Sequence, residues 1–200
     1  MTIPSDQLPP EARFFRRRRR ISQAELELNN HMRMLWEQHI TWTRLTIMSI
    51  AAGSADVDLV TRRLLRNPVD FARALEPFYG REIAGEFARL FTEHLVIASE
   101  LVTAAKAGNS QAAADAERRW YVNADQIAAF LGRINPHWSE TEWRTMLHEH
   151  LALTKAEAVD ILTEQFEAGI TVFDEIERQA LTMADTMTRG IVRQFPRRFV

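Results

Sequence analysis

Apolar residues recur along this chain at the three- and four-residue spacing of helices that bury one face. The pattern predicts six helical segments separated by turn-forming residues. The expected segments are residues 21–52, 57–76 with an interruption at Asn67-Pro68, 81–107, 110–133, a fifth that begins after Ser139, and 170–193. We therefore predict an all-α fold, an antiparallel bundle of six helices.

The fifth segment carries two helix-start signals. Ser139 followed by Glu142 is a capping-box pattern, and Thr154 followed by Glu157 has the same form. Because the second pattern falls inside an otherwise helical stretch, we expect the helix to break and restart near Leu153.

One short pattern occurs three times along the chain. Each copy places a histidine in an apolar helical run, follows it with an Ala-Gly turn, and has a marked segment on the returning helix. The histidines are His39, His94 and His150, the turns are Ala52-Gly53, Ala107-Gly108 and Ala168-Gly169, and the return segments begin at Asn67, Asn123 and Met183. Because these three sequence features recur together, we predict that the chain consists of three repeats of one helical hairpin.

The spacing of these marks sets the depth of each histidine. Gly53 lies midway in the sequence between His39 and Asn67, so the two side chains should be level across the first hairpin. Similar spacing around Gly108 makes His94 level with Asn123. His150, however, is farther from Gly169 than His39 is from Gly53, by five positions. Either His150 is about 7 Å deeper, or the break near Leu153 absorbs the difference.

The residues one helical turn from each histidine are mainly apolar, so the imidazoles should face the core. One interpretation is a metal site, because helix bundles build such sites from inward side chains. Its candidate ligands are His39, His94, His150, Asp125 and Asp185, and imidazole with carboxylate suits Fe, Zn or Mn. The Glu-x-x-His pattern of di-iron bundles and the His-Glu-x-x-His zinc motif are both absent from the sequence.

The alternative interpretation is structural. Each histidine would bond to an Asn or Asp across its hairpin and fix the register of the helices, as buried polar groups can do. A third interpretation is a small organic ligand held by Trp36, Trp42, Asn67 and Asn123, although aromatic residues at this spacing are more often simply core.

Composition narrows the class of protein. The chain has no cysteine, which excludes disulfides and thiolate catalysis and suits a reducing, cytoplasmic location. No apolar run approaches the roughly 20 residues of a membrane span. Glycine-rich phosphate loops, nucleophile elbows and dinucleotide fingerprints do not occur. We therefore expect a protein without a recognisable catalytic motif.

The net charge of −2 is unevenly distributed. Residues 1–20 form a basic N-terminal arm that includes Arg16 to Arg20, and residues 21–196 form an acidic helical domain. The arm is either an anion-binding segment or a solvated start of the first helix, and we favour the second. Nucleic-acid binding is not expected of the acidic domain, and a homo-oligomer is compatible with the sequence.

Several motifs resemble an uncharacterised bacterial all-helical family of about this length. They are Leu35-Trp36-Glu37-x-His39-x-x-Trp42-Thr43-Arg44, Leu64-Leu65-x-Asn67, Asn123-Ala124-Asp125-x-Ile127-Ala128-x-Phe130-Leu131, and Met183-Ala184-Asp185 with Gly190-Ile191. The likeness covers about residues 32–196 and implies an all-helical fold. Some members are catalogued as acetylglutamate kinase, an α/β fold with glycine-rich phosphate loops, and neither feature is expected here. The arginine run departs from the family pattern.

Overall fold

The computed structural model describes residues 20–200, and the regular elements of that part of the chain are helical. The elements are α1 (Gln23–Ala52), α2 (Val57–Leu64), α3 (Asn67–Lys106), α4 (Ser110–Ile134), α5 (Glu140–Leu162), α6 (Phe166–Gln194) and the short 3₁₀ helix η2 (Pro196–Arg198). The predicted all-α bundle is confirmed. Of the predicted basic arm, residues 1–19 lie outside the described residues.

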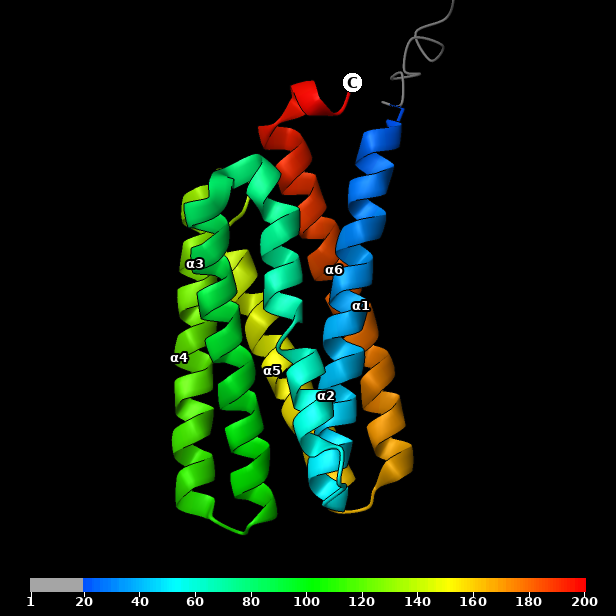
Figure 1. Ribbon diagram of the computed structural model, residues 1–200, viewed down its shortest axis with the longest axis vertical. Coiled ribbons are helices and arrows are strands. Elements are labelled where there is room, and N and C mark those ends of the chain that lie inside the picture. The colour runs from blue at the N-terminus through cyan, green and yellow to red at the C-terminus, as the bar shows by residue number, and fades with distance from the viewer. Residues whose placement is uncertain (1–19) are drawn as a thin grey trace, which may run out of the picture.

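Element α3 consists of two helical arms joined at Gly80. This glycine has φ 80° and ψ 166°, a conformation that residues with a Cβ rarely adopt. The chain reverses direction there, as the top of Figure 1 shows. The N-terminal arm of α3 (residues 67–79) therefore continues α2 back along α1, and the C-terminal arm (residues 81–106) starts the next hairpin. This division falls between the predicted helical segments 57–76 and 81–107.

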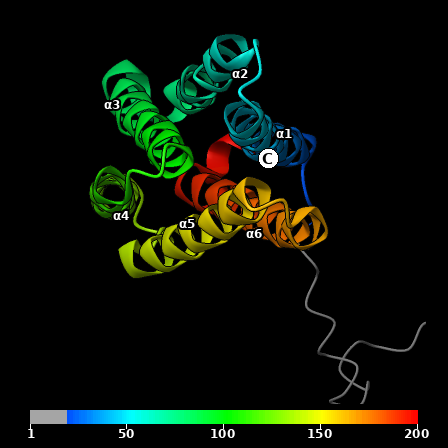
Figure 2. The same ribbon diagram turned by 90° about the horizontal axis from the view of Figure 1, so that it is seen from below.

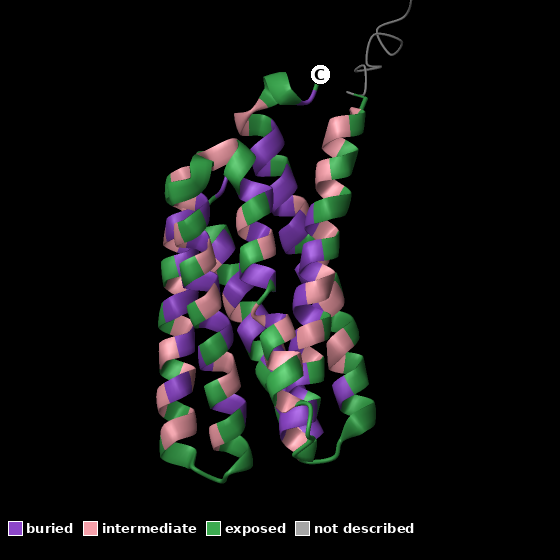
Figure 3. Cartoon of the chain, in the orientation of Figure 1, coloured by how far each residue is buried: buried purple, intermediate pink, exposed green. Residues whose placement is uncertain are grey.

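The chain thus forms three antiparallel hairpins. The first pairs α1 with α2 and the N-terminal arm of α3, the second pairs the C-terminal arm of α3 with α4, and the third pairs α5 with α6. Seen along the bundle, the helices follow one another in a ring that closes where α6 packs against α1 (Figure 2). Buried residues recur on all six helices (Figure 3), and most of the apolar ones pack into one core cluster.

Local sequence signals account for five of the ends of α1 to α6. The side chains of Ser22, Asn109 and Ser139 accept hydrogen bonds from backbone N–H groups in the first turns of α1, α4 and α5. Gly53 and Gly108 end the preceding helices at positive φ angles of 64° and 69°. These are two of the three Ala-Gly turns expected from the sequence.

The third expected turn, at Ala168-Gly169, is wrong. Helix α6 begins at Phe166, so Gly169 lies inside it, and the chain reverses instead at Glu164, which has a φ of 60°. Glu164 follows His150 at the same sequence separation at which Gly53 follows His39. The third hairpin therefore has no surplus length, and His150 is not displaced along the bundle.

Gly169 lies where α5 and α6 pack together, and an added Cβ would make only ordinary van der Waals contacts there. A Cβ built on it would lie 3.4 Å from Cβ of Asp160. Its carbonyl accepts a hydrogen bond of 3.2 Å from Arg44, whose guanidinium also bonds to the buried carboxylate of Glu157. Arg44 therefore ties α1 to both helices of the third hairpin.

The predicted break near Leu153 is also wrong, since α5 is continuous from Glu140 to Leu162. The pattern formed by Thr154 and Glu157 is not a cap. Thr154 and Glu157 are both buried, with exposed fractions of 4% and 1%. Their side chains face the interior of the bundle, and the hydroxyl of Thr154 accepts no hydrogen bond from a backbone N–H among residues 20–200.

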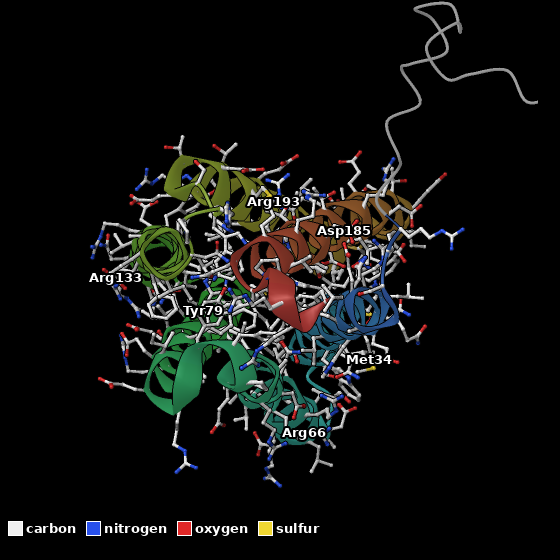
Figure 4. The ribbon with its side chains drawn as sticks, turned by 90° about the horizontal axis from the view of Figure 1, so that it is seen from above. Met34, Arg66, Tyr79, Arg133, Asp185 and Arg193 are labelled. Carbon is white, nitrogen blue, oxygen red and sulfur yellow. The ribbon has the colours of Figure 1, made fainter. Side chains whose placement is uncertain are left out.

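The upper end of the bundle is closed by aromatic residues. Trp138 lies directly over Gly190, and its indole N–H donates to the carbonyl of Thr186 at 3.2 Å. Tyr79 points inward there, donates to Gln194 and accepts from Asn135 (Figure 4). Phe199 is buried beyond the predicted domain end at residue 196. None of the helices among residues 20–200 combines the length and apolar character that a membrane span requires.

Candidate functional site in the bundle core

The three predicted histidines meet in the interior of the bundle. His39 comes from α1, His94 from the C-terminal arm of α3 and His150 from α5, and their exposed fractions are 2%, 2% and 3%. The Nε2 atoms of His39 and His150 are 3.3 Å apart. The prediction that the imidazoles face the core is confirmed. His39 and His150 lie at the same depth, and His94 lies close enough to influence both electrostatically.

A recurring contact, which we call the His–amide clamp, links each histidine-bearing helix to its returning helix. A side-chain amide on the returning helix donates to the backbone carbonyl one helical turn before the histidine. The donors and acceptors are Asn67 to Leu35 at 2.9 Å, Asn123 to Leu90 at 3.1 Å, and Gln179 to Met146 at 2.7 Å. Each amide N–H₂ is thereby oriented toward the helix that carries the histidine, and the amide oxygen is left as an acceptor.

In the second and third clamps the imidazole completes the contact. Nδ1 of His94 is 2.8 Å from Oδ1 of Asn123, and Nδ1 of His150 is 3.1 Å from Oε1 of Gln179. An amide oxygen can only accept, so both histidines carry their proton on Nδ1. Nε2 of His150 is then an acceptor when the ring is neutral, and the proton between the two rings belongs to Nε2 of His39.

The first clamp is open, because no hydrogen bond joins the amide oxygen of Asn67 to the imidazole of His39. If His39 carries its proton on Nε2, its Nδ1 is an acceptor, and so is Oδ1 of Asn67. Two acceptors cannot bond to each other, and within residues 20–200 neither atom has a hydrogen-bond partner. Both side chains are buried, so two polar atoms of the core are left unsatisfied.

Burial keeps the three rings neutral. Desolvation lowers the pKa of His94 to about 3, although its bond to Asn123 opposes the shift. Desolvation likewise lowers the pKa of His150 to about 4, against the opposing effect of Gln179. Burial is also the main cause that lowers the pKa of His39, and the neighbouring His150 and His94 add to it.

The structure does not bring Asp125 and Asp185 to the histidines. Asp125 lies at the surface between α4 and α5, where it contacts Arg144 at 3.1 Å and His148 at 2.8 Å. Asp185 is on α6 toward α1 (Figure 4), and it pairs with Arg33 at 2.9 Å. Among residues 20–200 no group of three or more histidines and carboxylates is placed to hold a metal ion.

The predicted aromatic residues separate as well. Trp36 is buried and meets His39 edge-on, with 5.5 Å between ring centroids. Trp42 lies at the junction of α1 and α2, where the guanidinium of Arg63 covers its ring at 4.8 Å. Of the predicted ligand-binding residues, Trp36, Asn67 and Asn123 therefore belong to the histidine region, and Trp42 does not.

Gln179 is the core residue that the sequence analysis missed. The expected segment at Met183 begins about one helical turn later, along the same face of α6. The signal that identifies Gln179 is its separation from His150, which is 29 residues, as between His94 and Asn123. Comparisons with protein families, with curated proteins and with solved structures find no match for this chain.

Proposed function

We propose that the protein is a helical scaffold whose three His–amide clamps set the register of its hairpins. The observation that carries this proposal is the recurrence of one amide-to-carbonyl hydrogen bond at sequence separations of 32, 33 and 33 residues. A helix that slid by one turn would leave the amide, the carbonyl and the imidazole unpaired in a dry core. Such a loss costs about 1–3 kcal/mol for each buried group.

We also infer that the three hairpins are copies of one unit. Support comes from the nearly equal intervals that separate His39, His94 and His150, because the same intervals separate the residues at the turns, Gly53, Gly108 and Glu164. Repeated units that pack side by side bury a core that none of them could bury alone.

Chemical cross-linking can test the register directly, because the chain has no cysteine of its own. The side chains of Glu100 and Arg119 meet across the second hairpin at 2.7 Å. Glu100→Cys with Arg119→Cys is therefore an in-register pair, and Ala104→Cys with Arg119→Cys is a pair displaced by about one turn. A short bifunctional thiol reagent should join the first pair far faster than the second.

The clamp is then removed by Asn123→Leu in both double-cysteine proteins. If the clamp sets register, the displaced pair gains cross-linking and the in-register pair loses it. Arg118→Leu, an exposed change on the same helix, is the matched control and should leave both rates unchanged. Unaltered rates in a folded Asn123→Leu protein would overturn the proposal.

A second candidate function is metal binding between His39 and His150. Their 3.3 Å Nε2 separation is close to that of two nitrogen ligands on a tetrahedral ion with bonds of about 2.0–2.1 Å. Gln179 holds the far nitrogen of His150, as an outer partner holds a metal-bound imidazole. Against it, no third histidine or carboxylate among residues 20–200 is placed to complete a site for Fe, Zn or Mn, and the buried carboxylate of Glu157 is already paired with Arg44.

Elemental analysis of protein purified without a His-tag distinguishes the two candidates. Scaffold function alone predicts far less than one metal ion per chain. A stoichiometric ion that disappears in His150→Gln, while the exposed substitution His137→Gln keeps it, would favour the metal site.

A further inference from the structure

A small cavity lies next to the histidines, toward the turns at Gly53 and Gly108. Its volume is about 30 Å³. The residues one turn beyond the three histidines, Thr43, Ala98 and Thr154, form part of its wall. The next turn supplies apolar side chains, among them Ile47 and Ala158. The cavity therefore lies directly next to the three histidines, and its wall is mainly apolar.

Two buried polar groups on this wall are unsatisfied. Trp120 and Thr154 both line the cavity, and their exposed fractions are 3% and 4%. From residue 20 onward, neither Nε1 of Trp120 nor Oγ1 of Thr154 has a hydrogen-bond partner. The hydroxyl of Thr43, by contrast, donates to the carbonyl of His39 at 2.8 Å. Two donors thus remain available at one apolar cavity, which requires an explanation.

The charge of the wall limits what could occupy it. Lys155 also contributes to the lining, but its ammonium group pairs with Glu117 at 2.6 Å in an exposed position. A charged occupant would have to leave water for an apolar enclosure without a counter-charge. The volume is about twice the 10–15 Å³ that one water molecule needs, so it suits a molecule of about two or three non-hydrogen atoms.

We infer that this cavity is a binding site for a small uncharged molecule that carries a hydrogen-bond acceptor. The acceptor atom of the ligand accepts hydrogen bonds from the indole N–H of Trp120 and the hydroxyl of Thr154. The rest of the molecule contacts Ile47, Val102 and Ala158. This inference does not rest on the scaffold function, because it uses neither the clamps nor the imidazoles.

The test uses ethanol as the probe and the indole N–H signals of the full chain in nitrogen-15 NMR. The chain has five tryptophans, and Trp120→Phe identifies the signal of Trp120. We expect that signal alone to shift and to saturate. The dissociation constant should be roughly millimolar or weaker, since so small a ligand has about 1.5 kcal/mol of affinity per non-hydrogen atom at most. Trp143 is the internal control, because it too is buried with an unpartnered Nε1 among the described residues, yet it does not line the cavity.

Two variants separate specific binding from solvent effects. Thr154→Val keeps the shape and removes the hydroxyl, so it should weaken ethanol binding about fivefold, the value of one neutral hydrogen bond. Ala158→Leu fills the space and should abolish saturation. Shifts of all five indoles without saturation would overturn the inference, and so would equal ethanol affinity in Thr154→Val. A water molecule that stays in contact with Trp120 at saturating ethanol would overturn it too.

Discussion

At the scale of single residues, the placement of protons explains the asymmetry of the core. His94 and His150 donate through Nδ1 to amide oxygens. His39 faces His150 with Nε2 instead, so it has no proton left for Asn67 when the ring is neutral. Three similar side-chain sets therefore make different numbers of hydrogen bonds, although their backbones are equivalent.

This asymmetry predicts different costs for the same substitution. Asn123→Leu removes the bond to Leu90 and leaves Nδ1–H of His94 unpaired, so it should lower the free energy of unfolding by about 2–3 kcal/mol. Asn67→Leu removes one bond and an unsatisfied acceptor, so its cost should be about 1 kcal/mol. Urea denaturation of both variants measures the difference. Equal costs would mean that His39 does not have the assigned proton.

The neutral histidines also predict acid sensitivity. An unfolded histidine titrates near 6.5, whereas His94 and His150 titrate at about 3 and about 4 in the folded protein. Below pH 6.5 the unfolded chain binds more protons than the folded one, so stability is complete above that pH and falls as the pH drops toward 4 and then 3. Each histidine contributes a slope of about 1.4 kcal/mol per pH unit. The urea concentration at the unfolding midpoint should fall as the pH is lowered from 7.5 to 4.5. The midpoint of the His150→Gln variant should fall less steeply.

At the scale of elements, the turns show why the third hairpin was misassigned. Gly53 and Gly108 are glycines at positive φ, which is the usual helix ending, but the equivalent residue in the third hairpin is Glu164. A glutamate gives no turn signal, while Ala168-Gly169 nearby imitates one. Gly169 has no left-handed backbone, and an added Cβ would make only ordinary van der Waals contacts with α5, so this glycine marks neither a turn nor a close helix approach.

The strained turn can be relieved. Glu164→Gly should raise the free energy of unfolding by about 1 kcal/mol, because glycine adopts the left-handed conformation without a Cβ penalty. Gly108→Ala should lower it by a similar amount, and it is the cleaner comparison because nothing lies within 4 Å of the added Cβ. Thermal unfolding monitored by circular dichroism measures both changes, and a loss of stability in Glu164→Gly would contradict this account.

The contact between Trp138 and α6 depends on one glycine. A Cβ added to Gly190 would lie 1.8 Å from Nε1 of Trp138, and a buried indole cannot move aside easily. Gly190→Ala should therefore destabilise the protein by about 3 kcal/mol. Gly85→Ala is the matched control, because that position is open and helical and alanine should be favourable there by up to about 1 kcal/mol. Near-ultraviolet circular dichroism should report the displaced Trp138 in the first variant alone.

At the scale of the whole molecule, much of the architecture follows from periodicity. The helical segments, the reversal at Gly80 and the inward histidines could be predicted, because each leaves a spacing or a turn residue in the sequence. Apolar periodicity did not identify Gln179, since Met183 lies one turn farther along the same face of α6, and only the shared separation from the histidine distinguishes the two positions. A sequence does not show which ring nitrogen of a histidine carries the proton. The open first clamp could therefore be recognised only from the contacts of His39 and His150 in the structure.

The open clamp affects where local opening of the bundle begins. The segment that covers His39 is anchored by one bond fewer than its counterparts, and in α2, the short helix leading to it, Leu64 is the buried residue. Transient separation should therefore begin at this end of the first hairpin, so amide protons of α2 should exchange with solvent sooner than those in the middle of α4 or α6. A reagent or proton that reaches the interior would then enter beside His39, whose Nδ1 has no hydrogen-bond partner among the described residues.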